Sequence, residues 1–197
     1  MEERKAFDIL IDYPKKHNLE YVTHRKHKRN LLVPSDPITN KKFVIFQSDD
    51  FFFLASDSFG MRVSSGSTYT GLYGAINLPK NIELKMFKRF WIDRILRSNI
   101  RRTGHSFIDK HVTITSNNKT LVNQLINDRA IKHFNAISNR DFPFNLVIAF
   151  DYVPLISPLK NKMIIGIETK DWLYQDNDLE ALLTHGKQLL SSIIKNV

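Results

Sequence analysis

The sequence contains no cysteine, and this absence excludes several kinds of chemistry at once. The chain can form no disulfide bond, no thiolate metal site and no cysteine nucleophile. A chain without cysteine is compatible with a reducing compartment. The first residues, Met1-Glu-Glu-Arg-Lys5, are not followed by the apolar segment of a signal peptide, so we expect a cytoplasmic protein.

Long apolar runs and the motifs of common enzymes are also missing. The longest apolar stretches, such as residues 144–150, are too short to span a bilayer. No G-x-S-x-G motif, no dinucleotide or phosphate-binding glycine loop and no H-E-x-x-H motif occurs. His24 and His27 lie three residues apart, but the cations around them would repel a metal ion. We therefore expect no cofactor and no bound metal.

What the sequence does contain is an uneven excess of basic residues. The 197 residues include 29 Lys and Arg against 20 Asp and Glu, a net charge of +9. Nearly all of this excess lies in residues 1–104, where 19 basic residues stand against 11 acidic ones, a net +8. The asymmetry predicts a basic face and an anionic partner, either an acidic protein or a nucleic acid.

Two segments, 23–29 and 85–102, concentrate the basic residues. Lysines and arginines in such runs can neutralise phosphates, and aromatic side chains between them, such as Trp91, can stack on bases. The second segment could instead lie on an anionic membrane surface. The alternative for both is structural: a solvated turn at 23–29, and an amphipathic element of helical spacing near 87–100. The candidate anion-binding residues are Arg25, Lys26, Lys28, Arg29, Lys88, Arg89, Arg94, Arg97, Arg101 and Arg102.

The hydrophobic pattern predicts an α+β fold with two layers, in which a mostly antiparallel sheet carries helices on one face. The first half reads as a short helix at 2–12 that Pro14 perturbs, with Asn18 as a left-handed stop, followed by a strand at 19–22. Residues 43–46 and 51–55 form a predicted hairpin, 56–74 a second one, and 82–86 a half-buried strand. We expect a single domain over residues 1–197, or two intertwined halves divided near residue 104.

The second half is more regular. We expect strands at 112–115, 144–150 and 163–167, and helices within 118–137 and at 178–195. Asn177 and Glu180 have the spacing of a capping box at the start of the last helix. Gly186 lies on the apolar face of that helix, where a close approach to the sheet would explain it.

The stretch from Phe107 onwards resembles a family of uncharacterised bacterial proteins. In that family a Phe-Asp segment enters a strand of the type V-x-I-x-[ST]-N, followed by helices, two apolar strands and a final helix. The matching residues here run from Phe107 through Asp109 and Val112-Thr-Ile114 to Asn117, with Ile108 interrupting the Phe-Asp pair. The resemblance implies an α+β domain of bacterial type and transfers no catalytic residue.

One arrangement has the spacing of an enzyme. Asp151 follows one predicted strand, and Glu168 and Lys170 end the next, as in metal-dependent nucleases with a D…E-x-K signature. Asp151 and Glu168 would share a divalent cation, and Lys170 would lie near the attacking water. The Pro-Asp pair usual in such enzymes is missing, and short patterns of acids and lysine occur in many chains by chance.

We therefore expect a non-catalytic binding or accessory module with a basic N-terminal half. A metal-dependent nuclease using Asp151, Glu168 and Lys170 is the first alternative. A protein that binds to the surface of a membrane is the second.

Overall fold

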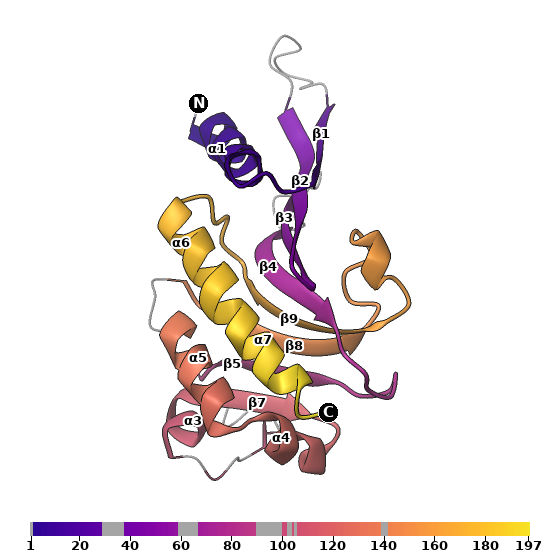
Figure 1. The fold of residues 1–197 in the computed structure, drawn as a ribbon, viewed down its shortest axis with the longest axis vertical. Helices are drawn as coiled ribbons and strands as arrows, with labels where there is room; N and C mark the ends of the chain where they lie inside the picture. Colours follow the sequence, from indigo (N-terminus) through magenta and orange to yellow (C-terminus); the bar gives the residue numbers. More distant parts are fainter. Residues whose placement is uncertain are drawn as a thin grey trace.

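The fold is described from a computed structural model, for residues 2–28, 38–58, 67–89, 100–101, 104, 106–138 and 142–197. The strands in this part of the chain form one sheet in the order β1-β2-β3-β4-β9-β8-β5-β7-β6 (Figure 1). Every neighbouring pair in the sheet is antiparallel, which confirms the predicted α+β class and antiparallel sheet. The strands are β1 Tyr21–Lys28, β2 Ile38–Ser48, β3 Phe51–Ser58, β4 Ser67–Ala75, β5 Leu84–Lys88, β6 Ile100–Arg101, β7 Val112–Ser116, β8 Asn145–Phe150 and β9 Met163–Thr169.

The helices bring their apolar side chains into one common core. This core joins residues of α1, α4, α5, α6 and α7 to alternate residues of the strands, among them Phe46, Leu72 and Ile165. We call the side of the sheet that carries these alternate residues the inner face. The helices are α1 Glu2–Lys16, α3 Ser106–His111, α4 Lys119–Leu125, α5 Asp128–Ser138, α6 Asp176–Ala181, the π-helix η3 Leu182–Gly186 and α7 Lys187–Ile194.

The opposite side of the sheet, which we call the outer face, has a smaller core. Leu54, Tyr73 and Ile164 of the sheet pack there against residues of the connection between β8 and β9, which contains the 3₁₀-helix η2 Ser157–Leu159. This connection covers the outer face over β4 and β9. The two faces therefore differ in how far other parts of the described chain cover them.

The first four strands form a meander that follows α1. Helix α1 continues through Pro14 to Lys16, so the predicted end at residue 12 is wrong. Asn18 ends α1 with a positive φ of 52°, and Asp49 turns β2 into β3 with a φ of 55°. The predicted solvated turn at the basic run 23–29 is wrong for residues 23–28, and its predicted contact with anions stays a prediction. Residues 23–28 belong to β1, which pairs with β2 over its whole length, because backbone pairing and cross-strand contacts outweigh a charged composition.

The predicted elements of the second half are present. The helical region 118–137 consists of two helices, and Asn118 caps the first by accepting a hydrogen bond from the amide of Leu121 at 3.1 Å. The helical spacing from Phe87 onwards does not begin a helix at Phe87, which belongs to β5. Residues 90–99 of that stretch lie outside the described residues.

The last helix begins and continues differently from the prediction. Its N-cap is Gln175, so Asn177 lies inside the first turn and the predicted capping box is wrong. A π-turn, η3, interrupts the helix between α6 and α7. Gly186 ends this turn against the sheet, where a Cβ atom would lie 3.3 Å from Ile167 and 3.5 Å from Leu72. The expected close approach at Gly186 is confirmed.

Candidate anion-binding surface

The predicted basic residues divide into those that make internal contacts and those that face water. Arg25 makes an ion pair with Asp8 of α1 at 3.3 Å, and its guanidinium lies 4.2 Å from the centre of the Phe7 ring. Arg89 donates to the carbonyl of Asp109 and to the hydroxyl of Thr113. Arg25 thus connects the sheet to α1, and Arg89 connects the end of β5 to β7 and α3.

Lys26 and Lys88 are both exposed, but they lie far apart. Lys26 is on β1 and Lys88 is on β5, six positions away in the strand order. Six spacings of about 4.8 Å amount to roughly 29 Å along the sheet. By strand alternation, Lys26 projects from the outer face and Lys88 from the inner face. Arg29, Arg94, Arg97 and Arg102 lie outside the described residues, as do the side chains of Lys28 and Arg101.

The outer side of β1 and β2 combines cations with aromatic and aliphatic side chains. The strand register places Lys26 opposite Lys41, His24 opposite Phe43, and Val22 opposite Ile45. The rings of His24 and Phe43 are stacked with their centres 5.3 Å apart. We call these six residues the β1–β2 surface. They contain no acidic side chain, so this patch is uniformly basic or apolar.

The β1–β2 surface lies beyond the part of the outer face that the connection between β8 and β9 covers. His24 and Lys26 are exposed, Val22 is 61% exposed, and Lys41, Phe43 and Ile45 are half-buried. On β3 and β4 the half-buried Phe52 and Tyr69 extend the apolar part towards the covered region. Exposed apolar patches bordered by polar residues commonly mark contact sites.

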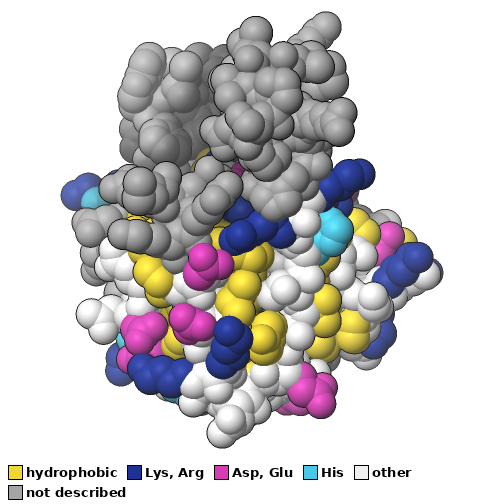
Figure 2. Space-filling model, turned by 90° about the horizontal axis from the view of Figure 1, so that it is seen from above, with side chains coloured by type: hydrophobic (Ala, Val, Ile, Leu, Met, Phe, Trp, Pro, Cys, Tyr) yellow, Lys and Arg dark blue, Asp and Glu magenta, His cyan; other side chains and the backbone are white. Residues whose placement is uncertain are grey.

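Figure 2 shows the molecule from the end at which Figure 1 draws α1, β1 and β2. On the described part of that face, Lys and Arg side chains lie close to Asp and Glu side chains. Some of these charges are paired, as in the contact of Lys187 with Asp49 at 2.6 Å. Mixed charges cancel at a distance, whereas the cations of the β1–β2 surface do not meet an acidic neighbour across the strands.

Lys41 and Phe43 were not among the candidates derived from the sequence. The signal that could have found them is the run Phe43-Val-Ile-Phe46, which is apolar at every position. A strand of this kind has apolar side chains on both faces. Side chains on one face stay partly exposed where that face is only partly covered, and this is the case at Phe43 and Ile45, which pack against the smaller core of the outer face.

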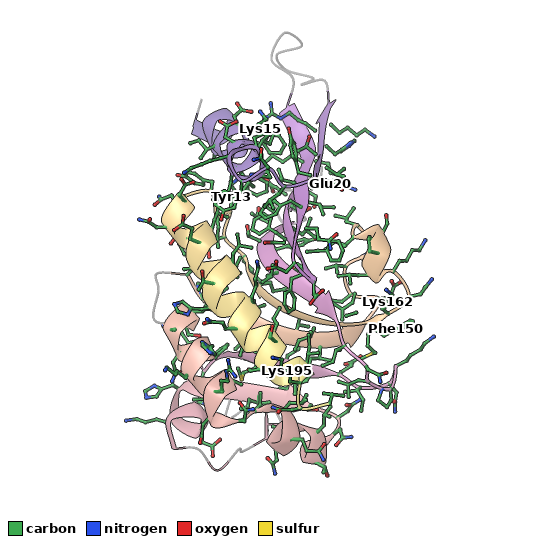
Figure 3. The ribbon with its side chains drawn as sticks, viewed as in Figure 1. Tyr13, Lys15, Glu20, Phe150, Lys162 and Lys195 are labelled. Carbon is green, nitrogen blue, oxygen red and sulfur yellow. The ribbon has the colours of Figure 1, made fainter. Side chains whose placement is uncertain are left out.

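The structure does not bring the D…E-x-K residues together. Asp151 follows β8 and its amide bonds to the carbonyl of Lys162, at the start of β9, whereas Glu168 lies near the other end of β9. Figure 3 labels Phe150 and Lys162, the neighbours of Asp151, at one end of the two strands. Five to six residues along a strand correspond to roughly 17–20 Å, but carboxylates that share a cation need oxygens within about 2.6 Å of it.

The side chains of Asp151 and Glu168 instead make local contacts. Asp151 accepts a hydrogen bond from the amide of Asn161 at 2.9 Å inside the connection between β8 and β9. Glu168 accepts hydrogen bonds from the hydroxyls of Tyr73 and Tyr152, each at 2.7 Å. Lys170 is exposed just beyond the end of β9.

The two tyrosines that bind Glu168 are held in their protonated form. Burial raises the pKa of the Tyr73 hydroxyl well above its ordinary value of 10, and the charge of Glu168 raises it further. The same causes, in the same order, raise the pKa of Tyr152. Both hydroxyls are therefore lasting donors at neutral pH, so Glu168 ties the β8–β9 connection, through Tyr152, to the sheet.

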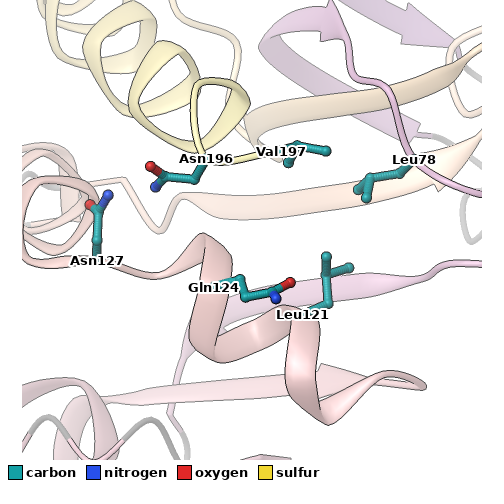
Figure 4. A pocket seen from close by; sticks show the side chains of 6 residues that line it. All are labelled: Leu78, Leu121, Gln124, Asn127, Asn196 and Val197. Carbon is teal, nitrogen blue, oxygen red and sulfur yellow. The ribbon is translucent and has the colours of Figure 1, made fainter.

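A pocket of about 490 Å³ lies elsewhere, beside α4 and the last residues of the chain (Figure 4). Its lining consists of amide and aliphatic side chains, so the pocket offers no acid, base or nucleophile. The lining residues are Leu78, Leu121, Gln124, Asn127, Asn196 and Val197. Within the described residues, no three His, Cys, Asp or Glu side chains gather as a metal site would require.

Comparisons with known proteins found no relative of this chain. No family model, no curated protein and no solved structure matches the chain. Among the described helices, none has the length and apolar character needed to cross a membrane. The resemblance of the second half to a bacterial family stays a prediction.

Proposed function

We propose that the protein is a non-catalytic binding module that attaches to an anionic partner through the β1–β2 surface. The observation that carries this proposal is the juxtaposition of exposed Lys26 and half-buried Lys41 with the stacked rings of His24 and Phe43. Cations attract the charges of an anionic partner, and the flat aromatic and aliphatic surface beside them provides area that association removes from water.

The position of these residues supports the proposal over the nuclease alternative. The D…E-x-K residues lie apart and Glu168 is used to hold two tyrosine hydroxyls, whereas the cations of the β1–β2 surface have no ion pair among the described side chains. Pairing with β2 fixes the backbone that carries Lys26 and His24, so on binding only their side chains need further ordering.

The test compares the double variant Lys26→Gln/Lys41→Gln with the matched control Lys160→Gln/Lys162→Gln. The control residues are exposed in the connection between β8 and β9, and their substitution removes the same amount of charge. Binding of labelled polyglutamate, single-stranded oligonucleotides and anionic vesicles is measured by fluorescence anisotropy or sedimentation at several salt concentrations.

We expect the first variant to lose affinity for a polyanion while the control keeps it. For a single-stranded oligonucleotide, removing two contacting cations lowers the slope of log K against log salt by up to roughly 1.4. Equal losses in both variants would show that only net charge matters. Binding to vesicles alone would favour the membrane-surface alternative, and no binding at low salt would refute the proposal.

A further inference from the structure

Strand β1 has one edge that no other part of the described chain occupies. It stands first in the strand order, and its only partner there is β2 (Figure 1). The backbone hydrogen bonds outside the regular elements join other segments of the described chain and leave this edge untouched. An edge of this kind presents a row of unpaired N–H and C=O groups that can receive another extended chain.

The charges on β1 decide which kind of chain can pair with it. The strand contains the run Thr23-His-Arg-Lys-His-Lys28, so a second copy of β1 laid against it would place cations opposite cations. An acidic segment would instead gain attraction along the same length. Near the start of the strand, the exposed Val22 and Tyr21 offer apolar contacts to residues of the added segment.

We infer that the partner of this protein is another protein that contributes an extended acidic segment, which adds to the sheet as a strand beside β1. The inference rests on the proposed function, because Lys26 and His24 of the β1–β2 surface would face the acidic side chains of the added strand. It goes further in that main-chain hydrogen bonds, which a nucleic acid cannot make in this pattern, fix the position of the partner. The register of β1 with β2 shifts between Lys26 and His27, so the regular edge runs from residue 21 to residue 26.

The experiment uses a synthetic peptide as a probe of strand addition. The peptide has about eight residues, the length of β1, and alternates Glu or Asp with Val or Ile. A matched peptide of the same sequence carries N-methyl groups on alternate residues, in one version at the odd positions and in another at the even positions. Methylation keeps the charge and removes the N–H donors of one edge of the peptide.

We expect the unmodified peptide to bind and to protect from hydrogen exchange those alternate amides of residues 21–26 that point away from β2. One of the two methylated peptides should bind at least about tenfold more weakly, because it loses several main-chain hydrogen bonds. Lys26→Glu should weaken binding of the unmodified peptide, while Lys162→Glu, far from β1, should not.

The outcomes separate this inference from the proposed function. Equal binding of all three peptides, with sensitivity to Lys26, would overturn strand addition and leave an anion-binding surface in place. Binding of oligonucleotides without binding of any peptide would also overturn strand addition and leave the anion-binding surface in place. Failure of peptides, oligonucleotides and polyglutamate alike would overturn both.

Discussion

The hydrogen bonds of Glu168 allow a quantitative test of its structural role. Replacing Tyr73 by Phe removes a fully buried hydroxyl that donates to the Glu168 carboxyl group at 2.7 Å. A hydrogen bond to a charged group contributes about 1.5–3 kcal/mol to stability, and its loss leaves an acceptor less well satisfied. The ring itself stays, so no cavity larger than one oxygen atom forms.

The expected magnitude differs between the two tyrosines that bind Glu168. We expect Tyr73→Phe to lower the free energy of unfolding by about 2 kcal/mol, which corresponds to a fall in melting temperature of roughly 4–8 °C for a chain of this size. Tyr152 is 37% exposed, so water can replace its hydroxyl, and Tyr152→Phe should cost less than about 1 kcal/mol. The double variant should show non-additivity, because both hydroxyls serve one carboxyl group.

Urea unfolding followed by circular dichroism measures these differences through the midpoint concentration. Tyr21→Phe is the matched control, since Tyr21 is also 37% exposed and makes no hydrogen bond among those described through its hydroxyl. A Tyr73→Phe protein as stable as the wild type would refute the reasoning. Strict additivity of the two substitutions would show that the hydroxyls act independently.

Three further predictions concern other parts of the fold. Burial, nearby His185 and cations of α5 lower the pKa of His133 below 6.5, so His133 binds a proton more readily in the unfolded chain than in the folded one. The free energy of unfolding should therefore fall as the pH drops from about 6.5. The variant His133→Gln should flatten the dependence of melting temperature on pH. Leu183→Asp places an unpaired charge at a site that is 7% exposed and should destabilise the fold by several kcal/mol in urea unfolding; a wild-type midpoint would contradict this. Gly166→Ala should cost about 1–3 kcal/mol in the same assay, because a Cβ there would overlap the ring of Tyr73, and an unchanged midpoint would show that the ring moves freely.

The sequence was sufficient to predict elements whose own residues determine them. The apolar strands β8 and β9 depend on local signals, and the structure contains them. The positive φ at Asn18 is of the same kind, since asparagine tolerates this conformation more readily than most residues do.

The arrangement of the candidate sites could not be predicted, because it depends on which strands become neighbours. A D…E-x-K site requires Asp151 and Glu168 to lie at the same end of the sheet. Because β8 and β9 are antiparallel neighbours and both residues follow or end their strands, Asp151 and Glu168 lie near opposite ends of the strand pair. Whether the basic residues form one face also depends on which strands are neighbours. Lys26 and Lys88 belong to strands whose order in the sheet is set by long-range pairing, and spacing along the chain contains no information about that order.

The pairing of β4 with β9 has a consequence for how the chain reaches its folded state. Strands β1 to β4 are consecutive, so they can pair early. The second partner of β4 is β9, which follows roughly 90 residues later in the chain. At a synthesis rate of about 5–20 residues per second, that strand emerges roughly 5–20 seconds after β4. During this interval β4 presents an open edge next to Leu72 and Tyr73, which are fully buried in the finished protein. Folding should therefore be slow for a chain of this length, and the nascent chain should be most prone to aggregation, and to capture by chaperones, before β9 is made.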